Sequence, residues 1–186
     1  MSAPLQTPRL KLVPAHPALA GRVAAFFERN AAHLAPWEPR RAQLADPFVQ
    51  QLHLEQMAKA FEEGSGWRWL LLAANDDTRV LGSVTVNNIV RGFFHSGNLG
   101  YALDAQAQGT GLMQEAVEAV VAHLFSPGVD LHRLQAACRP ENARSLALLD
   151  RLGFRTIGLA ERYLLIDGEW RDHYLTELVR PVGLPG

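Results

Sequence analysis

Apolar residues recur at helical spacing in four segments of the chain, and each segment predicts an amphipathic helix. The spacing is clearest between Leu112 and Phe125, where apolar side chains fall every three or four residues. Asp46 before Pro47 is typical of a helix start, because it places an N-cap residue ahead of a first-turn proline. The predicted helices cover residues 18–29, 47–63, 112–125 and 142–152.

Runs of alternating apolar and polar residues between these helices predict strands. Turn residues at 75–78 and at Asp167–Gly168 separate pairs of such runs, which is typical of hairpins. The predicted strands cover residues 10–13, 67–74, 80–90, 99–103, 132–138, 155–166 and 171–179. This order predicts an α+β fold with a mixed, mostly antiparallel sheet of about seven strands packed between helices. We expect one domain over residues 1–180 and a disordered tail over 181–186.

Composition and charge narrow the class of ligand. Of the 186 residues 48% are hydrophobic and 20% charged, and the formal net charge is -1, so we expect no nucleic-acid partner. The single cysteine, Cys138, excludes an internal disulfide and favours a reducing, cytoplasmic location. No apolar run approaches the ~20 residues of a membrane helix, and the seven histidines follow no metal-ligand spacing. We therefore expect neither a membrane partner nor a metal.

The segment Gln106–Gly111 lies between a predicted strand and the helix predicted over residues 112–125. Its glycines, Gly109 and Gly111, permit positive φ, so that consecutive N–H groups can point toward a phosphate. The free N–H groups and the dipole of the following helix favour the same anion. The segment therefore predicts an anion-binding loop.

The residues after Gly111 distinguish between the known phosphate-binding motifs. A P-loop has Lys and then Ser or Thr there, whereas this chain has Leu112 and Met113. A dinucleotide fingerprint has a third glycine where Gln114 stands, and it needs a parallel βαβ pattern that the hairpins contradict. The remaining pattern is Gln106, two residues, Gly109, one residue and then Gly111. It resembles the pyrophosphate loop of the GNAT acetyltransferases. A glycine turn that merely joins strand to helix is the alternative for this segment alone.

A second match to that family lies about thirty residues further on, in Asn142-Ala143-Arg144-Ser145 and Leu152-Gly153-Phe154. In the family an Asn at this helix start binds the pantetheine arm of the cofactor. Asn142 and Ser145, three residues apart, share one helix face, although capping the helix is another role open to Asn142. The resemblance implies a GNAT-type fold and acetyl-coenzyme A as cofactor. The residues expected to bind it are Leu103, Gln108, Gly109, Thr110, Gly111, Leu112, Met113, Asn142 and Ser145.

Residues 33–39, 90–95, 99–101 and 163–173 resemble one branch of that family, the RimJ/RimL-type ribosomal-protein alanine N-acetyltransferases. The resemblance implies that the acceptor is the N-terminal amine of a protein beginning with Ala or Ser, possibly a ribosomal protein. We expect three loops to converge over the thioester and to bind this acceptor through Trp37, Glu38, Arg91, His95, Trp170 and Asp172. A simple packing role for these residues stays open. The expected assembly is a monomer or a homodimer.

The catalytic groups of the family are only partly present. Many members have a tyrosine acid where this chain has Leu149, so Ser145 is the expected acid, because RimL-like relatives use a serine on this turn. Leu164 replaces the glutamate base of those relatives, and the base stays open among Glu161, Glu38 and His95. Two other functions also stay open: acetylation of a small-molecule amine, and a non-catalytic coenzyme A sensor.

Overall fold

A computed structural model of the chain describes residues 4–39 and 43–181, so that residues 182–186 of the predicted tail lie outside it. The helices are α1 (Ala20–Leu34), α2 (Pro47–Glu63), α3 (Leu112–Leu124) and α4 (Ala143–Arg151), with short 3-10 helices η1 (Pro17–Leu19) and η2 (Ala105–Ala107). The strands are β1 (Leu5–Gln6), β2 (Leu10–Pro14), β3 (Trp67–Ala73), β4 (Gly82–Val90), β5 (Ser96–Leu103), β6 (Arg133–Cys138), β7 (Arg155–Ile166) and β8 (Glu169–Val179).

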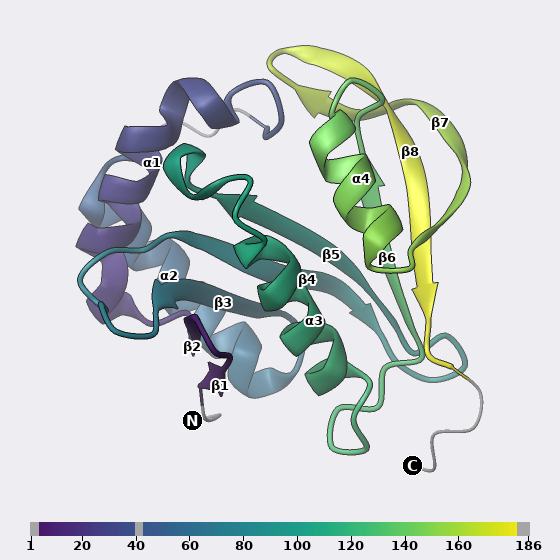
Figure 1. Cartoon of the computed structure of the whole chain (residues 1–186), viewed down its shortest axis with the longest axis horizontal. Helices are drawn as coiled ribbons and strands as arrows, with labels where there is room; N and C mark the ends of the chain where they lie inside the picture. The colour runs from purple at the N-terminus through teal and green to yellow at the C-terminus, as the bar shows by residue number, and fades with distance from the viewer. Residues whose placement is uncertain (1–3, 40–42, 182–186) are drawn as a thin grey trace.

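The described strands form one sheet in the order β1-β2-β3-β4-β5-β6-β8-β7. All neighbours are antiparallel except β5 and β6. The helices lie in two layers, α3 and α4 on one face of the sheet and α1 and α2 on the other (Figure 1). The predicted α+β fold with a mostly antiparallel sheet between helices is thus confirmed. Among the described residues, the two-residue strand β1 and the short helices η1 and η2 were not predicted.

Each face of the sheet has its own apolar core. On one face, the stripe of α3, including Val117 and Val120, packs with Trp69 of β3. On the other face, Leu70 and Leu72 of β3 pack with Phe26 of α1 and with α2. Because β3 is covered on both sides, its sequence is apolar almost throughout rather than alternating.

Helix α1 is longer than predicted. Its periodicity weakens after Arg29, yet the helix continues to Leu34, because the side chains of Asn30 and Leu34 are buried against the fold. Helix α2 begins as predicted, with the Asp46 side chain accepting a hydrogen bond from the N–H of Phe48, and ends at Gly64 in the left-handed conformation.

Strands β5 and β6 diverge after a short paired stretch. Their pairing covers only Ser96–Asn98 of β5 and Arg133–Gln135 of β6. Beyond it β5 continues to Leu103 and β6 to Cys138, and Figure 1 shows the two strands opening apart between α3 and α4. We call this opening the β5–β6 splay. Backbone groups of β5 that face it have no ladder partner there and are available to a ligand.

Candidate active site

The glycine loop leads from β5 into α3 at the open end of the splay. Gly109 and Gly111 have φ values of 75° and 80°, as the sequence predicted. A Cβ built on Gly109 has no neighbour within 4 Å, so its backbone is open to close approach. Gly111 caps α3 without any side-chain hydrogen bond. The first-turn N–H groups, those of Leu112 and Met113 among them, have no acceptor within the helix. The loop therefore has the geometry that a pyrophosphate requires.

A buried carboxylate anchors this loop to α1. Asp104, 2% exposed, accepts hydrogen bonds from Arg29 (3.0 Å), Asn30 (3.2 Å), Arg79 (2.8 Å) and the N–H of Gln106 (3.0 Å). The side-chain oxygen of Asn30 in turn accepts a hydrogen bond from the N–H of Ala105, the first residue of η2. Burial alone would raise the pKa of Asp104, but the hydrogen bonds outweigh it and hold that pKa well below its ordinary value. The carboxylate therefore stays charged and holds the start of the loop in place.

This anchor could not be predicted from the sequence, because its partners are distant in the chain. Asn30 and Asp104 are 74 residues apart, and a lone Asp after a strand has no local signal. The one indication in the sequence was Asn30, a polar residue within the apolar stripe of a helix, where a buried hydrogen-bond partner is needed.

The two halves of the family motif meet across the splay. Gln108 of the loop accepts a hydrogen bond from Arg144 on α4, and its amide nitrogen lies 2.9 Å from His33 Nε2 at the end of α1. Thr110 donates from its hydroxyl to the carbonyl of Ala107 (2.6 Å). Gln108 thus links the glycine loop to the start of α4.

Ser145 lies in a small polar cluster on the inner side of the splay. Its Oγ is 2.7 Å from the Oη of Tyr101 on β5. The thiol of Cys138 on β6 is close enough for Ser145 to influence its pKa, and it donates to the carbonyls of Arg139 (3.6 Å) and Asn142 (3.8 Å). Burial raises the pKa of Tyr101 above its ordinary value, with the Ser145 hydrogen bond offsetting part of the rise. Burial likewise raises the pKa of Cys138. Two hydroxyls and a thiol, all protonated at neutral pH, therefore meet where β5 and β6 are furthest from pairing.

Asn142 caps α4, which is the alternative that the sequence left open. Its Oδ1 accepts a hydrogen bond from the N–H of Ser145 (3.2 Å). The side chain stays partly exposed on the same turn, and the cap orients the residue that carries the hydroxyl.

Trp37 and Glu38 lie in the loop after α1, and the Arg139 side chain holds this loop against the end of β6. The Arg139 guanidinium donates to the carbonyl of Pro36 (2.6 Å) and lies 5.6 Å from the centroid of the Trp37 ring. Arg139 directly follows Cys138, so the contact brings the Trp37 loop to the mouth of the splay.

The β7–β8 hairpin reaches the same end of the molecule. Tyr174 pairs with Cys138, so that the first residues of β8 extend past the end of β6 (Figure 1). Trp170 is 61% exposed there. Asp172 accepts a hydrogen bond from the N–H of Arg162 (2.8 Å) at an irregularity of β7, which gives it a structural role in the hairpin.

Arg91 and His95 lie elsewhere, so the expected convergence of three loops is wrong for this one. They are in the β4–β5 turn, beside the paired stretch of β5 and β6, whereas the splay opens at the other ends of these strands. Arg91 donates to the carbonyl of Val129, and His95 Nδ1 lies 2.8 Å from the carbonyl of Asp130. Both residues contact the loop after α3.

Two leucines occupy the positions of the family's tyrosine acid and glutamate base, and Glu161 is the remaining candidate base. Leu149 is 2% exposed and belongs to the apolar core, and Leu164 is 39% exposed on β7. Glu161 is exposed on the same edge strand. Among residues 4–39 and 43–181, no group of three His, Cys, Asp or Glu side chains is placed to hold a metal. No helix in the described ranges has the length and apolar character to cross a membrane.

Comparison with known proteins agrees with this geometry. The family model for the acetyltransferase (GNAT) domain matches residues 9–155. The chain is 39% identical over 183 residues to the [ribosomal protein uS5]-alanine N-acetyltransferase of Escherichia coli (strain K12), covering 98% of this chain and 93% of that protein. The crystal structure of the ribosomal-protein-S5-alanine acetyltransferase from Vibrio fischeri has a TM-score of 0.92 at 32% identity, over 99% of this chain and 100% of that one.

A second solved structure, Mycobacterium smegmatis RimJ in complex with CoA-disulfide, has a TM-score of 0.85 at 27% identity and covers 96% of this chain and 90% of that one. The family match spans most of the chain. The chain therefore belongs to the GNAT acetyltransferase family.

Proposed function

We propose that this acetyltransferase transfers the acetyl group of acetyl-coenzyme A to the N-terminal α-amine of a protein beginning with Ala or Ser, and that a ribosomal protein is its acceptor. The observation that carries the proposal is the 39% identity, over nearly the whole chain, to an enzyme named for the alanine of ribosomal protein uS5. The proposed acceptors are made in the cytoplasm, so we place the activity there.

The proposed cofactor fits the residues present. Gly109 leaves the backbone open to close approach, and Gln108 and Thr110 flank it. The start of α3 after Gly111 has no side-chain cap and offers N–H groups to the pyrophosphate. The pantetheine arm would lie in the splay beside Leu103 and Asn142. When bound, acetyl-coenzyme A supplies an activated thioester. The M. smegmatis structure with CoA-disulfide supports this cofactor.

Ser145 is the proposed proton donor to the departing sulfur. Its Oγ is 2.7 Å from Tyr101 Oη, and the raised pKa of Tyr101 keeps that phenol protonated. Ser145 can therefore donate its proton to the departing thiolate while it accepts one from Tyr101, and the proton that the attacking amine loses restores the pair. Because the N–H of Ser145 bonds to Asn142, the hydroxyl is held on a rigid helix start.

Attack by the amine requires little from a base. An α-amine has a pKa near 8, so about a tenth is neutral at pH 7 without assistance. The N–H groups of β5 beyond Asn98 that face the splay are the proposed donors to the negative charge that develops on the carbonyl oxygen. No side chain is assigned as base.

A panel of acceptors tests the proposal. The wild-type protein is incubated with acetyl-coenzyme A and with peptides beginning with Ala, Ser, Gly or Leu, with the same peptides N-terminally blocked, and with spermine and free alanine. We expect Ala- and Ser-initiated peptides to have the highest kcat/KM by mass-detected acetylation, and blocked peptides to be inert. Faster acetylation of spermine or of free alanine would assign a small-molecule acceptor instead.

A further inference from the structure

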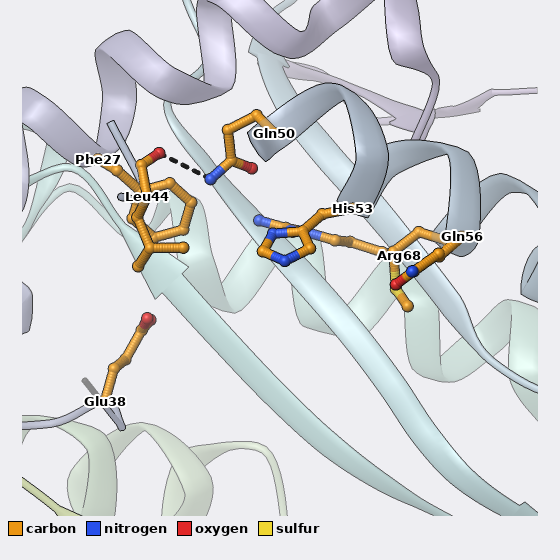
Figure 2. Close-up of a pocket in the computed structure, with 8 residues that line it drawn as sticks. Phe27, Glu38, Leu44, Gln50, His53, Gln56 and Arg68 are labelled. Carbon is orange, nitrogen blue, oxygen red and sulfur yellow. Dashed lines mark hydrogen bonds between the residues drawn. The ribbon is translucent and has the colours of Figure 1, made fainter. Parts of the chain in front are cut away.

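A polar pocket of about 290 Å³ lies between α1, α2 and β3, on the face of the sheet opposite to α3 and α4. Its polar lining comes from Glu38 after α1, from Gln50, His53 and Gln56 on α2, and from Arg68 on β3. Phe27 and Met57 add apolar walls. Figure 2 shows side chains from these separate elements pointing into one space.

Gln50 is the residue that points to a ligand. It is 0% exposed, and its amide nitrogen donates to the carbonyl of Leu44 (2.7 Å), the contact drawn as a dashed line in Figure 2. Its Oε1 is buried and has no hydrogen-bond partner among the described residues. A buried acceptor without a partner is costly, so a hydrogen-bond donor that enters the pocket and reaches Gln50 Oε1 would remove that cost.

The pocket connects to the splay along one row of the sheet. Arg68 pairs with Thr85 of β4, and Thr85 pairs with Gly100 of β5, so all three face the α1/α2 side. Gly100 is exposed, and a Cβ built on it has no neighbour within 4 Å. The next residue, Tyr101, points to the other face and contacts Ser145. The row therefore leads from the pocket to the strand that borders the proposed catalytic cluster.

The length of this row matches a short stretch of peptide. Two strand spacings of ~4.8 Å separate Arg68 from Gly100, about 10 Å in all, and an extended chain rises ~3.3 Å per residue. A peptide whose amine reaches the splay at Gly100 would thus place a side chain near the pocket about three residues later.

We propose that the pocket is a specificity subsite for the acceptor, and that it receives a neutral side chain with both a donor and an acceptor, namely Asn, Gln or His, within the first few residues after the acetylated one. This inference rests on the proposed peptide acceptor. The side chain donates to Gln50 Oε1 and accepts from Arg68 or Gln56, which a carboxylate or an aliphatic side chain does not do. A cationic side chain could also donate to Gln50 Oε1, but it would lie beside the Arg68 guanidinium, which repels it.

The test uses Ala-initiated peptides in which Gln, His, Leu, Lys or Glu is placed in turn at position 2, 3 or 4. We expect the wild type to prefer Gln or His at one of these positions by about tenfold in kcat/KM, the worth of one buried hydrogen bond. Gln50→Leu should remove the preference. The matched control is Gln51→Leu, the same substitution on the exposed side of α2, which should retain it.

A second variant guards against misfolding of the first. Met57→Phe narrows the pocket from its apolar wall and should also remove the preference. The rise in Tm with coenzyme A, whose proposed site is on the other face, reports whether each variant is folded. Equal kcat/KM for all side chains at positions 2–4 in the wild type would show that the pocket holds only water. A preference that survives both variants would equally overturn the proposal. If the wild type acetylates no free peptide amine at all, the proposed function itself is wrong and this subsite falls with it.

Discussion

At the scale of single residues, Ser145 is the side chain on which turnover should depend most. Ser145→Ala removes the proposed proton donor but leaves its N–H bonded to Asn142, so the start of α4 is retained. We expect kcat to fall about 10²-fold, with the KM for acetyl-coenzyme A nearly unchanged. Steady-state kinetics with an Ala-initiated peptide measure both constants.

Tyr101→Phe is the informative companion to that change, because it deletes only the partner of the Ser145 hydroxyl. Its loss of kcat should be smaller than that of Ser145→Ala. If Tyr101→Phe costs more turnover than Ser145→Ala, the phenol rather than the serine is the proton donor.

Gly109 is the residue where backbone conformation decides cofactor binding. Its φ of 75° is unfavourable for a β-branched residue, and a Cβ would project into the open space where the loop meets the phosphate. We expect Gly109→Val to abolish the rise in Tm that coenzyme A produces in the wild type. Gly128→Val is the control, since a Cβ there also meets nothing within 4 Å and no positive φ is required. Retained stabilisation by coenzyme A in Gly109→Val would refute the loop assignment.

At the scale of elements, Asp104 joins η2 and the glycine loop to α1. Asp104→Asn leaves Arg29 and Arg79 without their carboxylate, and we expect a loss of roughly 1–3 kcal/mol in the free energy of unfolding, together with weaker coenzyme A binding. The measurement is denaturant unfolding with and without coenzyme A.

The depressed pKa of Asp104 also gives that stability a pH dependence. Because the folded pKa lies below the 3.8 of an unperturbed aspartate, the contribution is fully present well above that pH and is lost as the pH falls through it toward the folded pKa. Between pH 5 and pH 3 the wild type should therefore lose more stability than Asp104→Asn. Equal losses would mean that Asp104 is not the anchor.

Arg139 holds the loop after α1 in place, as Asp104 holds the start of the glycine loop. Arg139→Met removes the hydrogen bond to the Pro36 carbonyl and the contact with the Trp37 ring, so we expect a severalfold rise in the KM for peptide without a rise in the KM for acetyl-coenzyme A. Arg155→Met, at an exposed ion pair with Glu177, is the control and should change neither constant. A rise in both constants would show a general loss of structure rather than a misplaced loop.

Element positions followed from local pattern, and the exceptions have a common cause. Asp46-Pro47 and Gly64 mark the ends of α2 in the sequence as in the structure, because caps act over a few residues. The additional turn of α1 up to Leu34 depends on burial of Asn30 by residues far away in the chain. Contacts of that range leave no periodicity to detect.

At the scale of the whole molecule, the absence of a local signal for distant contacts also explains why Arg91 and His95 were wrongly expected at the acceptor site. The segments around Trp37, Arg91 and Trp170 all resemble one family branch, but a resemblance says nothing about which end of the sheet a turn occupies. The strand order decides it: β5 starts beside β6 and diverges toward Leu103, so the turn before β5 lies at the paired end. The conformation of the glycine loop was predictable because its glycines, strand and helix are contiguous in sequence.

The charges around the open end give the last prediction. Glu38 and the exposed Asp167 and Glu169 lie on the loop after α1 and on the β7–β8 hairpin, and Glu169 is already paired with Arg171 at 2.8 Å. The attraction for a basic acceptor arm should therefore be moderate and screened by salt. Raising the ionic strength from about 0.1 M to 1 M shortens the Debye length from about 10 Å to about 3 Å.

We therefore expect the KM of an Ala-initiated peptide with Lys and Arg beyond position 4 to rise a few-fold over that range, while the KM of a neutral peptide stays nearly constant. Glu38→Gln should reduce the salt response without lowering kcat, because the loop would keep its contact with Arg139. Asp150→Asn, on the exposed side of α4, is the matched control and should leave the response intact. Equal salt dependence of the two peptides would mean that acceptor selection depends on shape and hydrogen bonds alone, with no contribution from the field at the open end.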